Sequence, residues 1–271
     1  MPPTFRAAGS YDFNAFREDS GELERLQLQA QSSARLELHL LERMGLRDGQ
    51  DVLDLACGPG IISRLIAQAH PSSKVTALDL NGELLDVARK EAAAVGLTSI
   101  RFQQGDVYAP PLADGQFDFI YSRLLFQHLE DPMRALMSIR SLLRPGGVLC
   151  ILDVDDSWLT LVPEPEGFSS FTANAVRAQA ERGGNRQIGR QLGRLLEQSG
   201  YDRVEMHVET LSSRQLGMRA FLDITLAFKP LLLEGQELEE ATRVLEAVEA
   251  LVDDPDAWAF VGIFMARGFR S

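Results

Sequence analysis

Short apolar runs alternate with amphipathic stretches along residues 51–154. The apolar runs have the length of buried strands, and the stretches between them carry apolar residues at the spacing of one helix face. The runs predict strands at 51–56, 74–79, 99–104, 117–122 and 148–154, and the amphipathic stretches predict helices at 61–69, 83–95 and 132–143. Strands that alternate with helices of this length form a parallel sheet. Such a sheet binds its ligands at the carboxyl ends of the strands.

The segments on either side of this core have other patterns. We expect helices at 22–44, 168–182 and 187–199, and a helical cover at 216–251. Residues 204–211 alternate apolar and polar positions, which is typical of a half-exposed strand. Residues 257–266 form a nearly continuous apolar run, which is typical of a buried strand. No internal repeat or low-complexity linker divides the chain, so we expect one α/β domain over residues 1–271.

The net charge of −12 limits the partners of the protein. It repels nucleic acids at long range, and no dense cluster of Lys and Arg offsets it, so we expect no nucleic-acid partner. The two cysteines, Cys57 and Cys150, lie in apolar runs, as expected of reduced buried thiols rather than a disulfide framework. Neither they nor the four scattered histidines have the spacing of a zinc site, so we expect no bound metal.

The chain shows no targeting or membrane signal. Residues 1–20 are polar and mixed in charge, without the apolar core of a secretory signal. No stretch approaches the roughly 18 uncharged apolar residues that a membrane-spanning helix needs. We therefore expect a cytoplasmic protein without membrane contact.

The segment VLDLACGPG, from Val52 to Gly60, carries the strongest chemical signal. A buried strand ends here in glycines, and a helix follows at once. Glycine allows a tight turn and a close approach of the backbone to a ligand, and the helix N-terminus behind it presents free N–H groups. Alone this signal is weak, because an ordinary strand-to-helix turn has the same glycines. A dinucleotide-binding loop would have a third glycine where this chain has Ser63, which counts against NAD.

Carboxylates at two further strand ends strengthen this signal. Asp79 ends the second strand, 21 residues after Gly58, where a carboxylate can accept hydrogen bonds from both hydroxyls of a ribose. Asp106 follows the third strand at the same edge of the sheet. Each of these residues alone is equally well a helix cap or a turn residue. Together they favour a neutral or cationic nucleoside ligand over a phosphorylated one.

Five motifs together resemble the class I S-adenosylmethionine-dependent methyltransferases. They are VLDLACGPG at 52–60, ALDLN at 77–81, GDV at 105–107, FDFIYSRLLFQHLEDP at 117–132 and LRPGGVL at 143–149. The closest resemblance is to the bacterial small-molecule branch that includes the ubiquinone and menaquinone C-methyltransferases. It implies a Rossmann-like sheet of seven strands in the order 3-2-1-4-5-7-6, with strand 7 antiparallel and helices on both faces. It also implies S-adenosyl-L-methionine as the cofactor.

The resemblance implies an organisation within the single domain. We expect an N-terminal helical cap at 1–48, a cofactor-binding core at 50–155, and helical additions at 156–188 and 212–252 that form a lid over the acceptor. In such proteins the acceptor pocket is built from these additions, so the fold alone does not name the acceptor.

The resemblance also implies a set of cofactor-binding residues. Asp79 would hold the ribose with Leu80 against the adenine, and Asp106 would accept from the adenine amino group with Val107 beside the ring. The turn at the end of the first strand would line the methionine end. The whole expected set is Tyr11, Arg25, Gln29, Asp54, Ala56, Cys57, Gly58, Gly60, Asp79, Leu80, Gly105, Asp106, Val107, Ser122 and Arg123.

The expected reaction is methyl transfer to an oxygen, nitrogen or carbon atom of a small molecule in secondary or quinone-like metabolism. It depends on alignment of the reacting atoms and exclusion of water, and a general base is needed only where the acceptor loses a proton. His128 and Asp153 are the candidate bases, although His128 equally suits a packed residue at a helix terminus. Asp153, Asp155 and Asp156 form a cluster that binds a cationic acceptor, acts as a base or is simply a solvated turn.

Two other functions remain open from the sequence. One is a protein that binds S-adenosylmethionine for regulation or as a scaffold without transferring the methyl group. The other is an enzyme that uses the cofactor differently, for example by intramolecular cyclisation. The pattern fits a monomer and a homodimer equally well.

Overall fold

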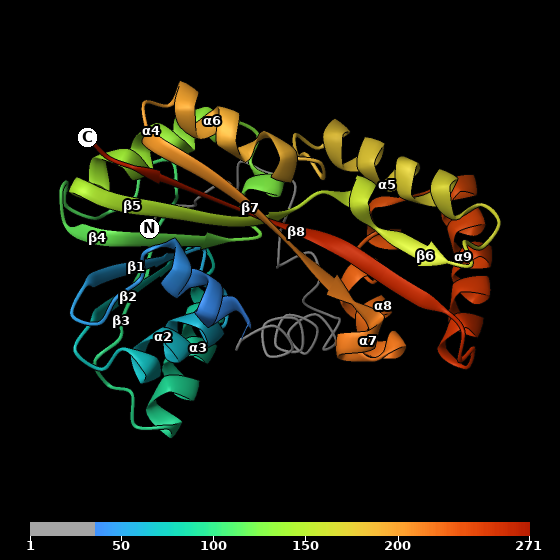
Figure 1. Ribbon diagram of the computed structural model, residues 1–271, viewed down its shortest axis with the longest axis horizontal. Helices are drawn as coiled ribbons and strands as arrows, with labels where there is room; N and C mark the ends of the chain where they lie inside the picture. Colours follow the sequence, from blue (N-terminus) through green and yellow to red (C-terminus); the bar gives the residue numbers. More distant parts are fainter. Residues whose placement is uncertain (1–35) are drawn as a thin grey trace, which may run out of the picture.

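The computed structural model describes residues 36–271, and one mixed sheet runs through them (Figure 1). Five strands lie parallel in the order β3-β2-β1-β4-β5. They are β1 (Asp51–Leu55), β2 (Lys74–Asp79), β3 (Arg101–Gln104), β4 (Phe117–Arg123) and β5 (Leu143–Val154). Each follows from one of the apolar runs, so the predicted parallel core is confirmed.

Antiparallel strands continue the sheet beyond β5. β8 (Trp258–Phe269) pairs antiparallel with β5, and β7 (Asp202–Ser212) pairs with the other edge of β8. The predicted order 3-2-1-4-5-7-6 is confirmed, with β8 as its antiparallel seventh strand and β7 as its sixth. One further strand, β6 (Thr160–Val162), pairs with the beginning of β8, so the described sheet has eight strands rather than seven. Three residues are too few to show an alternating pattern.

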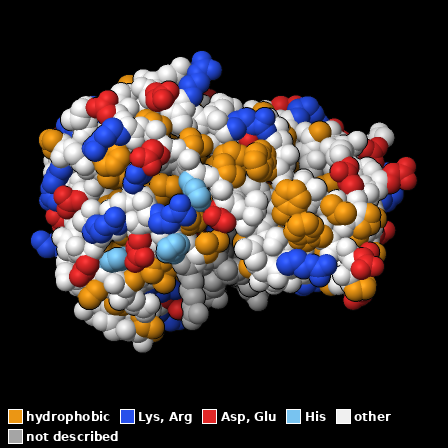
Figure 2. Space-filling model, in the orientation of Figure 1, with side chains coloured by type: hydrophobic (Ala, Val, Ile, Leu, Met, Phe, Trp, Pro, Cys, Tyr) orange, Lys and Arg blue, Asp and Glu red, His pale blue; other side chains and the backbone are white. Residues whose placement is uncertain are grey.

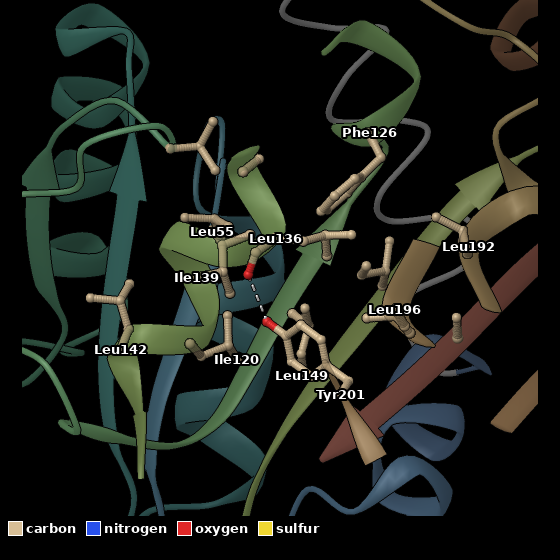
Figure 3. Close-up of a cluster of buried hydrophobic side chains, with 14 of the residues drawn as sticks. Leu55, Ile120, Phe126, Leu136, Ile139, Leu142, Leu149, Leu192, Leu196 and Tyr201 are labelled. Carbon is tan, nitrogen blue, oxygen red and sulfur yellow. Dashed lines mark hydrogen bonds between the residues drawn. The ribbon is translucent and has the colours of Figure 1, made fainter. Parts of the chain in front are cut away.

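Helices cover both faces of the parallel core. They are a helix at 36–44, α2 (Ile61–Ala69), α3 (Gly82–Ala94), α4 (Pro132–Leu142) and α6 (Leu192–Gln198). The first three pack with Val52 and Phe119 in one hydrophobic cluster. The last two pack with Leu53 and Leu149 in a second cluster, which Figure 3 shows. Neighbouring residues of a strand point to opposite faces, so the strands between these two clusters carry apolar residues on both faces.

Local signals set the ends of these helices. The Asn81 side chain accepts hydrogen bonds from the N–H groups of Glu83 and Leu84, which caps α3. The Asp131 side chain caps α4 in the same way, and Pro132 occupies the first turn, where its missing N–H costs nothing. The single helix expected at 187–199 is a short 3-10 turn, η4 (Gly189–Gln191), followed by α6.

An additional helical unit lies beyond the end of β5. Its helices are α5 (Phe168–Glu181), α7 (Ser213–Leu216), α8 (Met218–Leu226) and α9 (Gly235–Glu249), and its 3-10 turns are η5 (Pro230–Leu232) and η6 (Ala250–Val252). These elements share a third hydrophobic cluster with β6 and the first half of β8. Figure 1 shows them together at the far end of the sheet from α2 and α3. The second half of β8 lies between β5 and β7, so one strand belongs to both parts.

Two 3-10 turns lie where the core meets this unit. η2 (Phe126–His128) follows β4, and η3 (Asp156–Trp158) follows β5. Both therefore lie at the carboxyl ends of parallel strands, where the ligand of such a sheet is expected.

Candidate active site

The turn between β1 and α2 has the backbone that its glycines predicted. Ala56, Gly58 and Gly60 all have positive φ, at 59°, 53° and 70°. A Cβ atom on Gly60 would lie 2.8 Å from the Cβ atom of Ala88 in α3, so only glycine lets the turn pack there. A Cβ on Gly58 would meet no atom of the described residues within 4 Å. Gly58 is thus required by its conformation and faces open space beside the end of β1.

Asp79 connects this turn to the end of β2. One carboxylate oxygen accepts the N–H of Gly58 at 2.8 Å, and the other accepts the N–H of Asn81 at 2.8 Å. The N–H of Cys57 donates to the carbonyl of Leu78 at 3.0 Å. Burial raises the pKa of Asp79, although these backbone hydrogen bonds oppose the rise. The structure therefore brings three of the expected residues, Cys57, Gly58 and Asp79, into one hydrogen-bonded group.

Asp54 lies buried in β1 behind the same turn. The hydroxyl of Ser63 donates to its carboxylate at 2.5 Å. Burial raises the pKa of Asp54 to about 7, and the nearby charges of Glu37 and Asp79 act in the same direction. In the sequence, Ser63 is notable only because it stands where a dinucleotide-binding loop has its third glycine. No local pattern indicates its contact with Asp54.

The residues after β3 are held in a tight turn. The N–H of Gly105 donates to the carbonyl of Asp79 at 3.0 Å, and a side chain on Gly105 would collide with the ring of Pro111. The Asp106 carboxylate accepts the N–H of Tyr108 at 2.9 Å. Val107 is buried in the hydrophobic cluster around α4. The structure thus places the expected adenine-side residues next to the end of β2.

Leu80 lies beside this turn. It is half-buried, and its carbonyl accepts the side-chain amide of Gln104 at 2.9 Å. The strand ends β2 and β3 are therefore joined by a side chain as well as by the backbone.

The end of β4 carries Ser122 and Arg123. The Ser122 side chain is fully buried, and its hydroxyl has no hydrogen-bond partner within the described part of the chain. The Arg123 guanidinium donates to Glu37 at 2.9 Å, and the Tyr121 hydroxyl donates to the same carboxylate at 2.6 Å. Glu37 comes from the helix at 36–44, so this helix is fixed to the end of β4. The sequence did not indicate Glu37.

The two candidate bases lie close to each other. The N–H of Gln127 donates to the Asp153 carboxylate at 3.1 Å, and Gln127 directly precedes His128. Asp153 is fully buried, and burial raises its pKa to about 7. The Nδ1 atom of His128 lies 3.4 Å from the side-chain amide of Gln179 in α5. The structure thus places both bases where the core meets the helical additions.

Asp155 and Asp156 are neither a solvated turn nor free acids. Both are buried, and each forms an ion pair with an arginine, Asp155 with Arg190 and Asp156 with Arg186. The Lys229 ammonium also donates to Asp156 at 2.7 Å. The expectation that these acids bind a cationic acceptor or form a solvated turn is therefore wrong, because cations of the chain already occupy them.

The Asp156 cluster, formed by Asp156, Arg186 and Lys229, joins the core to the additional unit. Burial alone would raise the pKa of Asp156, but Lys229 and Arg186 lower it to about 2. Burial lowers the pKa of Lys229 to about 8. Asp156 and Lys229 are thus both mainly charged at neutral pH. The side-chain oxygen of Gln179 accepts from Arg186 at 3.0 Å, and the same amide reaches His128.

Three of the expected residues, Tyr11, Arg25 and Gln29, lie outside the described residues. Within residues 36–271, no group of three His, Cys, Asp or Glu side chains is arranged to hold a metal ion. In the same part of the chain, no helix is long and apolar enough to cross a membrane.

Comparisons with known proteins agree with this architecture. Residues 53–151 match a family model described as a methyltransferase domain. A malonyl-[acyl-carrier protein] O-methyltransferase of Pseudescherichia vulneris is 38% identical over 177 residues, which are 65% of this chain and 60% of that protein. The ubiquinone/menaquinone biosynthesis C-methyltransferase of Hahella chejuensis is 30% identical over 135 residues, which are 49% of this chain and 54% of that protein. The chain spans about half the length of the curated relatives that it matches.

A solved structure shows the same fold over nearly the whole chain. Phosphoethanolamine N-methyltransferase 2 of Haemonchus contortus, in complex with S-adenosyl-L-methionine, has a TM-score of 0.62 at 19% identity. The likeness covers 96% of this chain and 60% of that one. The motifs, the strand order and the family match agree, so the chain carries a class I S-adenosylmethionine-dependent methyltransferase domain, as its motifs predicted.

Proposed function

We propose that the protein transfers the methyl group of S-adenosyl-L-methionine to a small-molecule acceptor. The observation that carries this proposal is the position of the Asp79 carboxylate, which is held by the backbone of the glycine turn and of Asn81. A carboxylate offers about four lone-pair positions, and the backbone N–H groups of Gly58, Leu80 and Asn81 all act on this carboxylate. Its remaining acceptor capacity suits a ribose hydroxyl.

The residues present fit this cofactor. The turn at Gly58 leaves open space for a ligand beside backbone N–H groups. The buried Ser122 hydroxyl lacks a partner among the described residues and lies at the end of the neighbouring strand β4. Asp54 and the turn would hold the methionine end, and Asp106 would accept from the adenine amino group. When bound, the cofactor supplies an electrophilic methyl group on a positively charged sulfur.

The electrostatics of this edge favour a cation. Asp54 and Asp79 are buried acids whose described hydrogen-bond donors are a hydroxyl and backbone N–H groups. Arg123, the cation at the end of β4, is paired with Glu37. A phosphorylated nucleotide would therefore meet uncompensated acids, whereas a sulfonium or ammonium group would be attracted to them.

We further propose that the additions at 156–188 and 212–252 cover the acceptor, and that the residues before 48 cap the cofactor. The additions supply two direct neighbours of His128, the amide of Gln179 and the ring of Phe228, whose centroid is 5.9 Å from that of His128. They exclude water from the end of β4, which a displacement at carbon requires. Where the acceptor loses a proton, His128 or Asp153 accepts it.

The matched relatives include an O-methyltransferase and a C-methyltransferase. Their names do not agree on one acceptor atom, so oxygen, nitrogen and carbon acceptors are all to be tested. We propose that the protein acts in the cytoplasm and not on nucleic acids, since its charge of −12 repels polyanions.

The first experiment is calorimetric titration of the whole protein with S-adenosyl-L-methionine, followed by incubation with the cofactor alone. We expect binding without consumption until an acceptor from a panel of hydroxyl, amine and activated-carbon compounds is added. Consumption without any acceptor would support a reaction on the cofactor itself. Binding without consumption by any of the panel would favour a regulatory protein, and absence of binding would reject the proposal.

The candidate bases are separated by the variants His128→Ala and Asp153→Asn at saturating acceptor. Loss of a general base lowers kcat by about 10²–10⁴-fold. We expect this loss for one of the two variants, with unchanged cofactor affinity. An unaltered kcat in both would show that the acceptor needs no base from this site.

A further inference from the structure

Within residues 36–271, strand β7 has no strand partner along its outer edge. Among the described residues it pairs only with β8, and no other described element lies in front of it in Figure 1. An edge strand presents a row of unpaired N–H and C=O groups, which is a template for another strand. Proteins usually protect such an edge by making it short or by covering it. At 11 residues, β7 is not short, and α6 packs on its face without supplying a strand partner for its outer edge.

An apolar band runs beside this edge on one face of the sheet. We call it the tryptophan band, since it contains both tryptophans of the chain. Its members are exposed by 37–48% and are Trp158, Val162, Met206, Val208 and Trp258. Figure 2 shows hydrophobic side chains gathered over this part of the molecule. Exposed apolar surface of this kind marks an interaction site more often than a chance arrangement.

The strand register shows that the band is continuous. Val162 lies opposite Trp258, and Val208 lies opposite Phe264, against which the ring of Trp158 packs at 5.3 Å between centroids. Residues directly opposite in an antiparallel pair point to the same face. The band therefore extends from β6 across β8 to the outer edge at β7.

The charged residues on the other face of β7 are arranged so that one copy of the strand is complementary to a second, antiparallel copy. His207 and Glu209 alternate with the apolar positions, and their side chains lie 3.2 Å apart within the chain. If two copies of β7 pair antiparallel around Val208, the His207 of each lies opposite the Glu209 of the other. Pairing around His207 would instead place Glu205 opposite Glu209, which is unfavourable because like charges meet.

The regularly paired part of β7 is also centred close to Val208. A register shift between Asp202 and Glu205 interrupts its pairing with β8, and Arg203 there has a positive φ of 47°. Regular pairing runs from Glu205 to Ser212, so Val208 is near its middle. Around this centre, Met206 lies opposite Thr210 of the second copy and Val208 lies opposite itself.

We propose that the protein forms a two-fold homodimer in which β7 of one copy pairs antiparallel with β7 of the other, centred on Val208. The two sheets then form one continuous sheet, and the tryptophan bands of both copies lie on the same face. Such an interface is isologous, as is usual for dimers of identical chains. The parallel strands that carry Asp54 and Asp79 lie beyond β5 and β8 in the sheet, so the candidate active site stays open.

Sedimentation analysis of the whole protein over a range of concentrations tests the proposal without any ligand, and so independently of the proposed function. We expect a dimer for the unchanged chain and a monomer for Val208→Lys, since this variant places two lysines opposite each other. Met137→Lys on α4 is the matched control, because Met137 is also exposed but belongs to a helix and not to the strand that would pair. It should remain dimeric. Cofactor affinity should be unchanged in both variants.

Cysteine cross-linking tests the register. Val208→Cys should form a disulfide between copies under mild oxidation, because opposite residues in an antiparallel pair have Cβ atoms about 4.5–5.5 Å apart. Met206→Cys alone should not, whereas a mixture of Met206→Cys and Thr210→Cys chains should. The native Cys57 and Cys150 are buried.

Three results would overturn the proposal. One is a monomer at every concentration, and another is a dimer that Val208→Lys leaves intact. The third is cross-linking of Met206→Cys chains with themselves, which would show that the two copies of β7 pair in another register.

Discussion

Buried acids occur in two regions of the molecule, and their pKa values are shifted in opposite directions. At the carboxyl ends of the strands, Asp54 and Asp153 accept hydrogen bonds from a hydroxyl and from backbone N–H groups, and burial raises the pKa of each to about 7. At the junction with the additional unit, Asp156 is held by Arg186 and Lys229, which lower its pKa to about 2 against the effect of burial.

The difference shows which acids are available to a ligand. A buried carboxylate without a cation costs stability, because its charge is removed from water without compensation. Asp54 and Asp153 at the strand ends form no ion pair with a cation of the described chain, and a cationic ligand would offset this cost. At the junction, Arg186 and Lys229 pair with Asp156, so this acid connects the core to the additional unit.

The largest expected effect is on the junction. Asp156→Ala leaves Arg186 and Lys229 buried beside each other without their shared carboxylate. Removal of one partner from a buried ion pair costs about 3–5 kcal/mol, and we expect a loss of this size in the free energy of unfolding. Urea denaturation followed by circular dichroism measures it.

The control for this variant is Asp86→Ala on α3, whose carboxylate is exposed and pairs with Arg89. It should change the free energy of unfolding by less than about 1 kcal/mol. A similarly small loss for Asp156→Ala would show that the Asp156 cluster does not hold the additional unit to the core.

The second effect is on cofactor binding. Asp79→Ala should weaken the affinity for S-adenosyl-L-methionine by about 1.5–3 kcal/mol, which is the range for hydrogen bonds to a charged group. Isothermal titration calorimetry measures the change, again with Asp86→Ala as the control. An unchanged affinity would remove Asp79 from the ribose site.

The third effect concerns pH. If Asp54 faces the positively charged methionine end, the cofactor binds better to its carboxylate form. Because the pKa of free Asp54 is about 7, affinity should be highest above this pH and should fall as the pH decreases through 7, by at most tenfold, or about 1.4 kcal/mol, per pH unit. Asp54→Asn should remove this dependence. A pH profile that is the same in both proteins would assign the dependence to another group.

The smallest effect is expected from an ion pair on the surface. Arg177 of α5 pairs with Glu181 and with Glu237 of α9, and its side chain is about half exposed. Arg177→Ala should lower the free energy of unfolding by less than about 1 kcal/mol. A larger loss would mean that the additional unit depends on its surface charges as much as on the Asp156 cluster.

The sequence predicted those features whose signal is local. The turn from β1 to α2 could be recognised because strand, glycines and helix follow one another directly, and Asp79 could be placed because it ends the next strand. Partners that are far apart in the chain could not be found in this way. Lys229 is 73 residues from Asp156, and Glu37 is 86 residues from Arg123. No spacing rule connects such residues before the chain folds.

The same reason explains the error at Asp155 and Asp156. Three acids within four residues after a strand have the composition of a solvated turn. Only the fold brings Arg186, Arg190 and Lys229 to them. Charge patterns in a sequence thus indicate the number of acids at a site but not whether each is already neutralised.

The position of β8 late in the sequence determines when the parts of the fold that pair with it can form during synthesis. It is the last strand of the described chain, and β6 and β7 pair with no other described strand, whereas β5 also pairs with β4. Before β8 is synthesised, β7 has no strand partner among the described residues, and the third hydrophobic cluster lacks Ala259 and Val261. We therefore expect β6, β7 and the additional unit to become stable together, once β8 is available.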